Sequence, residues 1–323
     1  MIFRQLFDST SSTYSYLIAS RKGAEALIID PVLEKVDRYI KLLNELDLRL
    51  VKAVDTHLHA DHITGLAELR DRTHCITAMG EQTKADVVSM RLADGDKLGI
   101  EGVSLDVIYT PGHTDDSYSF AMQDRVFTGD TLLIRGTGRT DFQNGDPRQQ
   151  YDSIFNRLLR LHDDTMVFPA HDYKGDTVST IGEEKRSNPR LQVPSVDAYV
   201  ELMNNLNLPN PKMMDVAVPA DAALKLLGRP DVALVDLREK NERERHGTIP
   251  GALHVPYTEI DDNVKPGGVL HQLGAVQKLA FFCAFGERSA MAVTAAQEAG
   301  IGSACHIEGG IAAWKKAGGP VEH

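Results

Sequence analysis

A short run of metal-binding side chains at residues 56–62 constrains the fold of this chain more than any other feature. The run is Thr-His-Leu-His-Ala-Asp-His, and it holds four candidate metal ligands: His57, His59, Asp61 and His62. It follows the apolar segment 50–54, which predicts a strand, and precedes 63–69, which predicts a helix. Junctions of this kind, at the carboxyl ends of strands, are where open α/β folds bind ligands. The sequence therefore predicts an α/β protein with a metal site at this junction.

Three further residues able to bind a divalent ion each follow a predicted strand. His113 follows a strand-like run that ends in Pro-Gly, Asp130 follows one that ends in Gly, and His171 follows the run 166–170. A single histidine usually has an ordinary surface or core role. Here, however, ligand type and position at a strand end coincide repeatedly. We therefore interpret all seven residues as parts of one metal centre.

These residues resemble the His-x-His-x-Asp-His motif and the later His, Asp and His of the metallo-β-lactamase superfamily. Longer stretches look like persulfide dioxygenases, namely 130–143, His171-Asp172-Tyr173 and Ser187-Asn188-Pro189-Arg190. The resemblance runs from Met1 to near Pro219 and implies an N-terminal αββα sandwich. One departure is Thr137, where we expect Cys in the animal members.

The resemblance also implies a cofactor, a single Fe(II), with ligands His57, His113 and Asp130. The residues retained around it, or at a second metal position, would be His59, Asp61, His62 and His171. Two imidazoles and one carboxylate on one face of an octahedral ion leave three positions open. A persulfide sulfur and dioxygen could be held there in reacting geometry. Spacing alone does not choose iron over zinc, so the choice of iron rests on the resemblance.

Two polar residues are predicted to bind the substrate beside this metal. The guanidinium of Arg139 can bind a carboxylate of glutathione with two parallel hydrogen bonds. The phenol of Tyr173 can donate to a bound sulfur or carboxylate. The alternative is that both side chains only anchor their own loops.

A cysteine at a strand end forms a second candidate site. The run 278–282 predicts a buried strand and 289–296 a helix, and Cys283 opens the loop between them. Backbone N–H groups and the positive end of the helix dipole would surround its sulfur. Gly286 would allow positive φ, and Arg288 would add a fixed charge. This setting favours a thiolate or persulfide, whereas a lone cysteine is more often a small buried hydrophobe. The predicted catalytic residues are Cys283 and Arg288, and the predicted loop residues are Ala284, Phe285, Gly286 and Glu287.

This C-terminal region resembles the rhodanese family, and the matching stretches are 232–238, 247–256 and 309–314. The resemblance implies an α/β domain with a central parallel sheet. Four residues separate Cys283 from Arg288, one fewer than in the related Cys-based phosphatases, and the smaller loop suits sulfur transfer. The carboxylate of Glu287 would repel a dianion, so the loop favours persulfide over thiosulfate.

Composition restricts the class of protein further. A chain of 323 residues is long enough for two domains. Its net charge of −11 argues against nucleic acid or an anionic membrane as a partner. The three cysteines lack a CxxC spacing, and the N-terminus lacks the pattern of a signal peptide, so we expect a cytoplasmic protein. The oligomeric state is left open, with a homodimer as one expectation.

The domain boundary is predicted near Ala220. Residues 1–219 would form the dioxygenase domain and 220–323 the rhodanese domain. The segment 204–211 is rich in Asn and Pro, which is typical of a linker. Because the dioxygenase resemblance continues through Asp215–Pro219, we expect that segment to pack on the first domain.

The sequence thus predicts a fusion that acts in sulfide oxidation. Its first domain would convert glutathione persulfide, O2 and water to sulfite and glutathione. Its second domain would act as a thiosulfate sulfurtransferase, in which Cys283 passes sulfane sulfur between glutathione, sulfite and thiosulfate.

Two alternatives remain open at this point. A glyoxalase II-like enzyme would use the same seven residues to hold two zinc ions and hydrolyse a glutathione thioester. Alternatively, the C-terminal domain would be a non-enzymatic persulfide sensor or docking module.

Overall fold

The structure, a computed structural model, describes residues 1–59, 61–85, 88–141, 144–206, 217–284 and 286–323, and only the backbone of Glu287. Phe285, the Glu287 side chain, Phe142-Gln143 and most of the predicted linker 204–211 therefore lie outside the described part. The chain divides into two compact units, which we describe separately. One unit comprises Met1–His59 and Thr64–Asn207, and the other comprises Leu208–His323 together with Ala60–Ile63.

The N-terminal unit contains two mixed six-stranded sheets. The first has the order β1 (Ile2–Asp8), β2 (Thr13–Ala19), β3 (Glu25–Ile29), β4 (Arg49–Val54), β5 (Ile76–Gly80) and β6 (Met90–Leu92). The second has the order β12 (Ser179–Thr180), β11 (Met166–Pro169), β10 (Arg125–Gly129), β9 (Tyr118–Ala121), β8 (Val103–Tyr109) and β7 (Lys97–Ile100).

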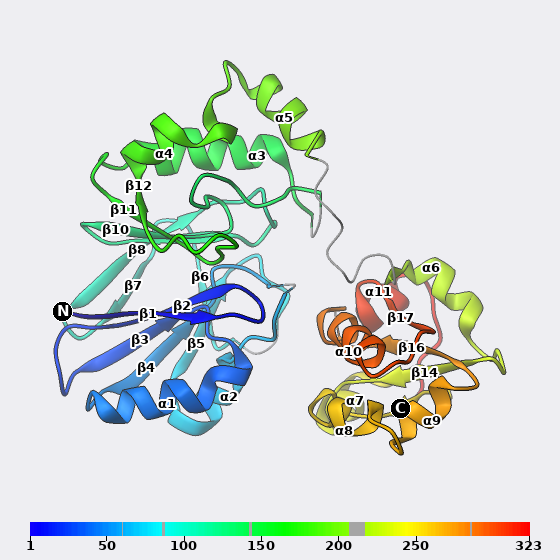
Figure 1. Cartoon of the computed structure of the whole chain (residues 1–323). Coiled ribbons are helices and arrows are strands. Elements are labelled where there is room, and N and C mark those ends of the chain that lie inside the picture. The colour runs from blue at the N-terminus through cyan, green and yellow to red at the C-terminus, as the bar shows by residue number, and fades with distance from the viewer. Residues whose placement is uncertain (60, 86–87, 142–143, 207–216, 285) are drawn as a thin grey trace. The chain divides into compact units, whose positions relative to one another are not determined.

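Helices cover the outer face of each sheet, as Figure 1 shows. The first sheet is covered by α1 (Val36–Glu45) and α2 (Leu66–Thr73). The second is covered by α3 (Pro147–Asp152), α4 (Ile181–Ser187) and α5 (Val196–Asn204). The four layers confirm the predicted αββα sandwich. Helix α2 begins at Leu66, three residues later than predicted. The described residues between β4 and α2, which include Asp61, form a loop.

Apolar strands explain why the two sheets pack together. Every residue of β2 is buried, because one of its faces meets the helices and the other meets the second sheet. The core between the sheets is aromatic: Tyr16 lies 4.9 Å from Phe127 between ring centroids, with Phe120 and Phe168 in the same cluster. This rigid core fixes the strand ends from which the candidate metal ligands emerge.

The C-terminal unit is built on one parallel sheet with the order β13 (Ala217–Val218), β17 (Ala304–Ile307), β16 (Lys278–Phe282), β14 (Val232–Asp236) and β15 (Leu253–His254). One face packs on α8 (Ile260–Val264), α9 (Val269–Gly274) and α10 (Glu287–Glu298). The other packs on α6 (Ala220–Ala223) and α11 (Gly310–Lys316), and α7 (Lys240–His246) follows β14. The predicted parallel sheet is confirmed.

One expectation about the segment between the domains was wrong. We expected Asp215–Pro219 to pack on the N-terminal domain. Instead, Ala217–Val218 pairs in parallel with β17, so this strand belongs to the C-terminal sheet. The boundary near Ala220 itself stays a prediction. Among the described residues, no helix is both long enough and apolar enough to span a bilayer.

Candidate metal centre and sulfur-transfer loop

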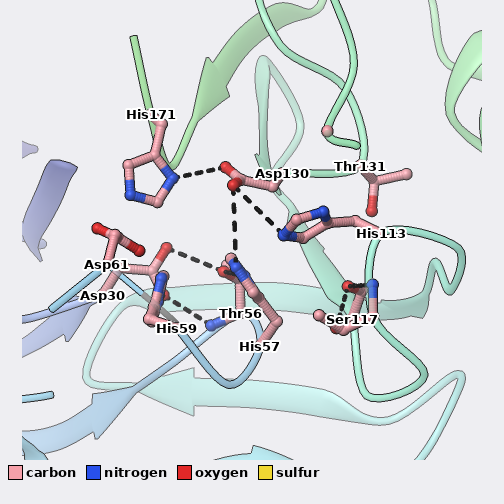
Figure 2. Close-up of polar contacts among 12 residues, drawn as sticks. Asp30, Thr56, His57, His59, Asp61, His113, Ser117, Asp130, Thr131 and His171 are labelled. Atoms are coloured by element: carbon pink, nitrogen blue, oxygen red, sulfur yellow. Dashed lines mark hydrogen bonds and ion pairs between the residues drawn. The ribbon is translucent and has the colours of Figure 1, made fainter. Parts of the chain in front are cut away.

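The predicted ligands converge from the ends of separate strands. His57 and His59 follow β4, His113 follows β8, Asp130 follows β10 and His171 follows β11. Two groups form, and within each the ligand atoms lie within 4.8 Å of one another. The first group is His57, His113 and Asp130, and the second is His59, Asp61, His62 and His171. Figure 2 shows the first group together with His59, Asp61 and His171 gathered at one site.

The first group presents three donor atoms to a common point. The Nε2 atom of His113 lies 3.5 Å from Oδ2 of Asp130, and Nε2 of His57 lies 4.0 Å from the same oxygen. Each of these side chains is largely buried. These three side chains would together hold a divalent ion.

Hydrogen bonds on the far side of each ring fix which nitrogen carries the proton. Thr56 donates its hydroxyl to Asp30, so its oxygen accepts from Nδ1 of His57 at 2.9 Å. The carbonyl of Arg139 can only accept, so it fixes a proton on Nδ1 of His113 at 2.8 Å. The Nε2 atoms of both rings face Asp130, and metal-binding imidazoles need their other nitrogen held by a partner in this way.

Charge states at this group also suit a divalent ion. Burial, with the neighbouring His59, lowers the pKa of His57 well below the ordinary histidine value, so the ring is neutral near pH 7. Burial raises the pKa of Asp130, but His171, His113 and His57 outweigh that effect and hold it below the usual range. A neutral His57 imidazole and an ionised Asp130 carboxylate fit an iron or zinc ion.

Protein side chains also engage the histidines of the second group. His59 contacts Asp30 through Nε2 at 3.2 Å, and Nδ1 of His62 lies 2.9 Å from Asp61. His171 meets Oδ1 of Asp130 through Nδ1 at 2.7 Å, and Nε2 lies 3.1 Å from the hydroxyl of Thr13. Each His in this group thus has at least one ring nitrogen in a hydrogen bond to a neighbouring side chain.

The two predicted substrate-binding residues both lie beside the metal ligands. The backbone of Arg139 contacts His113, while its guanidinium forms two hydrogen bonds, of 2.7 and 2.6 Å, to Asp141. The ring of Tyr173 is 70% exposed and stacks on His171, with an interplanar angle of 4°. An exposed phenol beside a metal ligand is accessible to a substrate.

In the C-terminal unit, Cys283 follows β16 and lies at the N-terminus of α10. Its buried sulfur accepts from the amide of Gly286 at 3.0 Å and lies 3.7 Å from the hydroxyl of Ser289. Gly286 has φ +116°, the positive value that was predicted. The carbonyls of Cys283 and Ala284 accept from amides at the start of α11. The loop is thus held from both sides.

The hydrogen bonds described for the Arg288 guanidinium do not go to the sulfur. They go to Glu242 on α7, at 2.8 and 2.6 Å. Burial raises the pKa of Glu242, but Arg288 outweighs it and the pKa is lowered. An ionised carboxylate therefore offsets the cation of this loop.

Sequence reasoning missed several residues that support the metal ligands. Asp30 follows β3 directly, and the rule that found Asp130 would have found it too. Thr56 was part of the quoted motif but was given no role. Gln150 lies on α3 and Tyr199 on α5, and no local sequence signal pointed to either residue.

The fold and this centre define the class of protein. Residues 9–86 and 78–171 match the metallo-beta-lactamase superfamily, and residues 219–317 match the rhodanese-like domain. The chain belongs to the metallo-beta-lactamase superfamily and carries a C-terminal rhodanese domain, as the sequence predicted.

Particular relatives narrow the class. Human mitochondrial persulfide dioxygenase ETHE1 is 43% identical over 223 residues, which cover 68% of this chain and 87% of that protein. The crystal structure of ETHE1 from Myxococcus xanthus is 52% identical, with a TM-score of 0.64 over 67% of this chain and 95% of that one. A metallo-beta-lactamase from Staphylococcus aureus shares the fold over 95% of this chain and 99% of its own, at 22% identity and a TM-score of 0.61.

Proposed function

We propose that the N-terminal domain oxidises glutathione persulfide with O2 and water to sulfite and glutathione, using one Fe(II) bound by His57, His113 and Asp130. The observation that carries this proposal is the convergence of the Nε2 atoms of His57 and His113 on one ionised carboxylate. When bound, iron would supply the redox change that dioxygen activation needs and that zinc lacks. The similarity to persulfide dioxygenases over two thirds of the chain supports this reaction.

A single ion is favoured over two by the state of His171. Its two nitrogens meet Asp130 and Thr13, so the ring is held between protein atoms. A second ion bound through His171 would have to displace one of these contacts, whereas an ion in the first group displaces none. We therefore assign His59, Asp61, His62 and His171 to support of the centre.

We propose that glutathione binds through Arg139 and Tyr173. Asp141 already forms a bidentate pair with Arg139 and is 59% exposed. A carboxylate of glutathione can take its place on the same guanidinium face. The exposed phenol of Tyr173 then donates to the persulfide end or to a second carboxylate.

In the rhodanese domain we propose that Cys283 carries sulfane sulfur. Its thiolate attacks the outer sulfur of the donor, the donor S–S bond breaks, and the thiol or sulfite leaves with the electron pair. The new persulfide is stabilised by the Gly286 amide and the N-terminus of α10. One direction makes thiosulfate from sulfite and a persulfide, and the other makes a persulfide from thiosulfate. The loop, with Glu287 and the Arg288–Glu242 pair, favours persulfide donors over thiosulfate.

Metal exchange under anaerobic conditions tests the dioxygenase proposal. The full-length protein is stripped of metal and loaded with Fe(II) or Zn(II), and O2 uptake and sulfite are then followed after addition of glutathione persulfide. Uptake with Fe(II) alone, lost in His113→Ala, is expected. Hydrolysis of S-lactoylglutathione by a form with two zinc ions, without O2 uptake by the iron form, would instead establish the thioesterase that the second ligand group allows.

A further inference from the structure

The loop 136–139, between β10 and α3, is held in an unusual way. Four successive backbone carbonyls each accept a hydrogen bond from a side chain elsewhere in the domain. The bonds run from Asn188 Nδ2 to Gly136 (2.9 Å), from Arg190 Nη1 to Thr137, from Gln150 Nε2 to Gly138 (3.0 Å) and from His113 Nδ1 to Arg139 (2.8 Å). Backbone carbonyls outside regular structure need partners when buried. Here the last partner is a candidate metal ligand.

The donors are themselves held by further polar contacts. Asn188 also donates to Glu184 at 2.8 Å. Gln150 is fully buried and accepts from the hydroxyl of Tyr199 at 2.8 Å. Arg190 reaches the hydroxyl of Thr137 at 3.1 Å in addition to the carbonyl. Each of these side chains makes a second polar contact in addition to its bond to a carbonyl of the loop. The two contacts together fix its rotamer.

Steric contact couples the loop to the metal centre. A Cβ atom at Gly138 would lie 2.3 Å from the carbonyl oxygen of Asp130 and 2.8 Å from Nδ1 of His113. The amide of Gly138 also donates to that carbonyl of Asp130 at 2.7 Å. A displacement of this loop is therefore a displacement of two of the three proposed ligands.

We propose that Asn188, Arg190 and Gln150, which we call the loop clamp, are positioning residues for the metal centre. They fix the peptide planes of 136–139, so that the carbonyl of Arg139 holds the His113 ring with Nε2 toward the metal. The inference rests on the proposed role of His113 and Asp130 as ligands. It also gives a physical role to Ser187-Asn188-Pro189-Arg190, the stretch of the sequence for which no function was assigned.

The local geometry of that stretch suits the role. Asn188 caps a short 3-10 turn, Pro189–Leu191, by accepting from the amide of Arg190 at 3.0 Å. Pro189 fixes φ at the first position of the turn. Asn188 and Arg190, the residues on either side of Pro189, are thereby aimed at neighbouring carbonyls of one loop.

Cobalt binding tests the clamp without depending on dioxygenase activity. The full-length protein is compared with Arg190→Met, which keeps length but removes the donor, with Arg190→Lys, and with the control Arg186→Met at an exposed site on the preceding helix. Co(II) affinity is measured by chelator competition, and the d–d absorption reports ligand geometry. We expect Arg190→Met to bind Co(II) about 10- to 100-fold more weakly with a changed spectrum. Arg190→Lys should recover part of the loss, and Arg186→Met should match wild type.

Wild-type affinity and spectrum in a folded Arg190→Met protein would overturn the proposal. If that variant does not fold, Tyr199→Phe decides, because it removes only the hydroxyl that holds Gln150. A few-fold loss of affinity with a changed spectrum supports the clamp, and unchanged values contradict it. Failure of the iron enzyme to oxidise persulfide, with Co(II) still bound in the clamp-dependent way, would refute the proposed reaction and not the clamp.

Discussion

The proposed metal centre and the proposed sulfur-transfer loop both place a reactive group at a strand end, but they do so by different means. The loop carries everything from Cys283 to Arg288 within six consecutive residues. Its sulfur is stabilised by local backbone and a helix N-terminus. The proposed metal centre gathers side chains from the ends of four strands between His57 and His171, and the His113 ring is oriented by a carbonyl 26 residues away.

The two sites should therefore be sensitive to different substitutions. A site built by its own backbone tolerates remote change but depends on its nucleophile and loop shape. A site built from separate strands depends on second partners such as Thr56, the Arg139 carbonyl and the loop clamp. Substitutions that affect one site and leave the other unchanged therefore test this difference.

The largest effect is expected from two variants, each of which should lose one activity and keep the other. Cys283→Ser should lower sulfur transfer at least about 1000-fold, because a hydroxyl is a far weaker nucleophile at neutral pH. Persulfide-dependent O2 uptake by the same variant should stay close to wild type. His113→Ala should show the reverse pattern. The measurements are an oxygen electrode and a sulfur-transfer assay on the same preparations.

Equal loss of both activities in either variant would contradict the separation of the sites. A different result is expected if the C-terminal domain is a non-enzymatic persulfide sensor. It requires sulfur transfer at background in wild type and in Cys283→Ser alike, while O2 uptake responds to the presence of the domain.

The next largest effect is expected on metal affinity, from substitution of Gly138 in the loop 136–139. Gly138→Ala places a Cβ against the Asp130 carbonyl and the His113 ring, so metal affinity should fall at least about tenfold. Gly136→Ala is the matched control, because the nearest atom to its added Cβ lies 3.9 Å away. Metal content after dialysis and Co(II) titration measure the difference. Equal affinities for the two variants would show that the loop does not set the ligand geometry.

How much of each site could be predicted from the sequence follows from the same contrast. The strand Lys278–Phe282 and the positive φ of Gly286 are local features, and the structure has them where the sequence placed them, although α10 begins two residues before the predicted helix. The seven metal-centre residues could also be found, because ligand type and strand ends are visible in the sequence. Gln150, Tyr199 and the contacts of Arg190 could not, since they depend on how helices pack over a sheet. The partner of Arg288 was missed for the same reason, because Glu242 comes from α7.

The unfolding free energy of the N-terminal domain should depend on pH through His57 and Asp130, which the C-terminal domain lacks. The pKa of His57 is lowered in the folded protein, so below about pH 6.5 the unfolded chain binds a proton that the folded chain does not. The unfolding free energy of the metal-free N-terminal domain should therefore decrease as the pH is lowered, by at most about 1.4 kcal/mol per pH unit for this group. Asp130, whose pKa is also lowered, acts in the same direction at lower pH.

Urea unfolding between pH 7.5 and 5.5 measures this effect. Far-UV circular dichroism follows both domains, whereas the fluorescence of Trp314, the single tryptophan, follows the C-terminal domain. His57→Gln should flatten the pH slope of the N-terminal transition and leave the fluorescence transition unchanged. The same slope in wild type and in His57→Gln would assign the effect to another group.

The smallest effect concerns substrate preference in the sulfur-transfer loop. Glu242 accepts two hydrogen bonds from Arg288, and both side chains are partly exposed. Glu242→Gln removes the negative charge and keeps an acceptor, so the attraction of the loop for the thiosulfate dianion should rise. We expect kcat/KM for thiosulfate to increase about two- to fivefold, the usual size for a partly exposed charge. A glutathione persulfide donor carries less charge at its sulfur and should gain less. The control is Glu244→Gln, on the same helix but paired with Lys240 at 3.8 Å. An unchanged ratio of the two donors in Glu242→Gln would mean that backbone shape, and not the charge on Arg288, selects the donor.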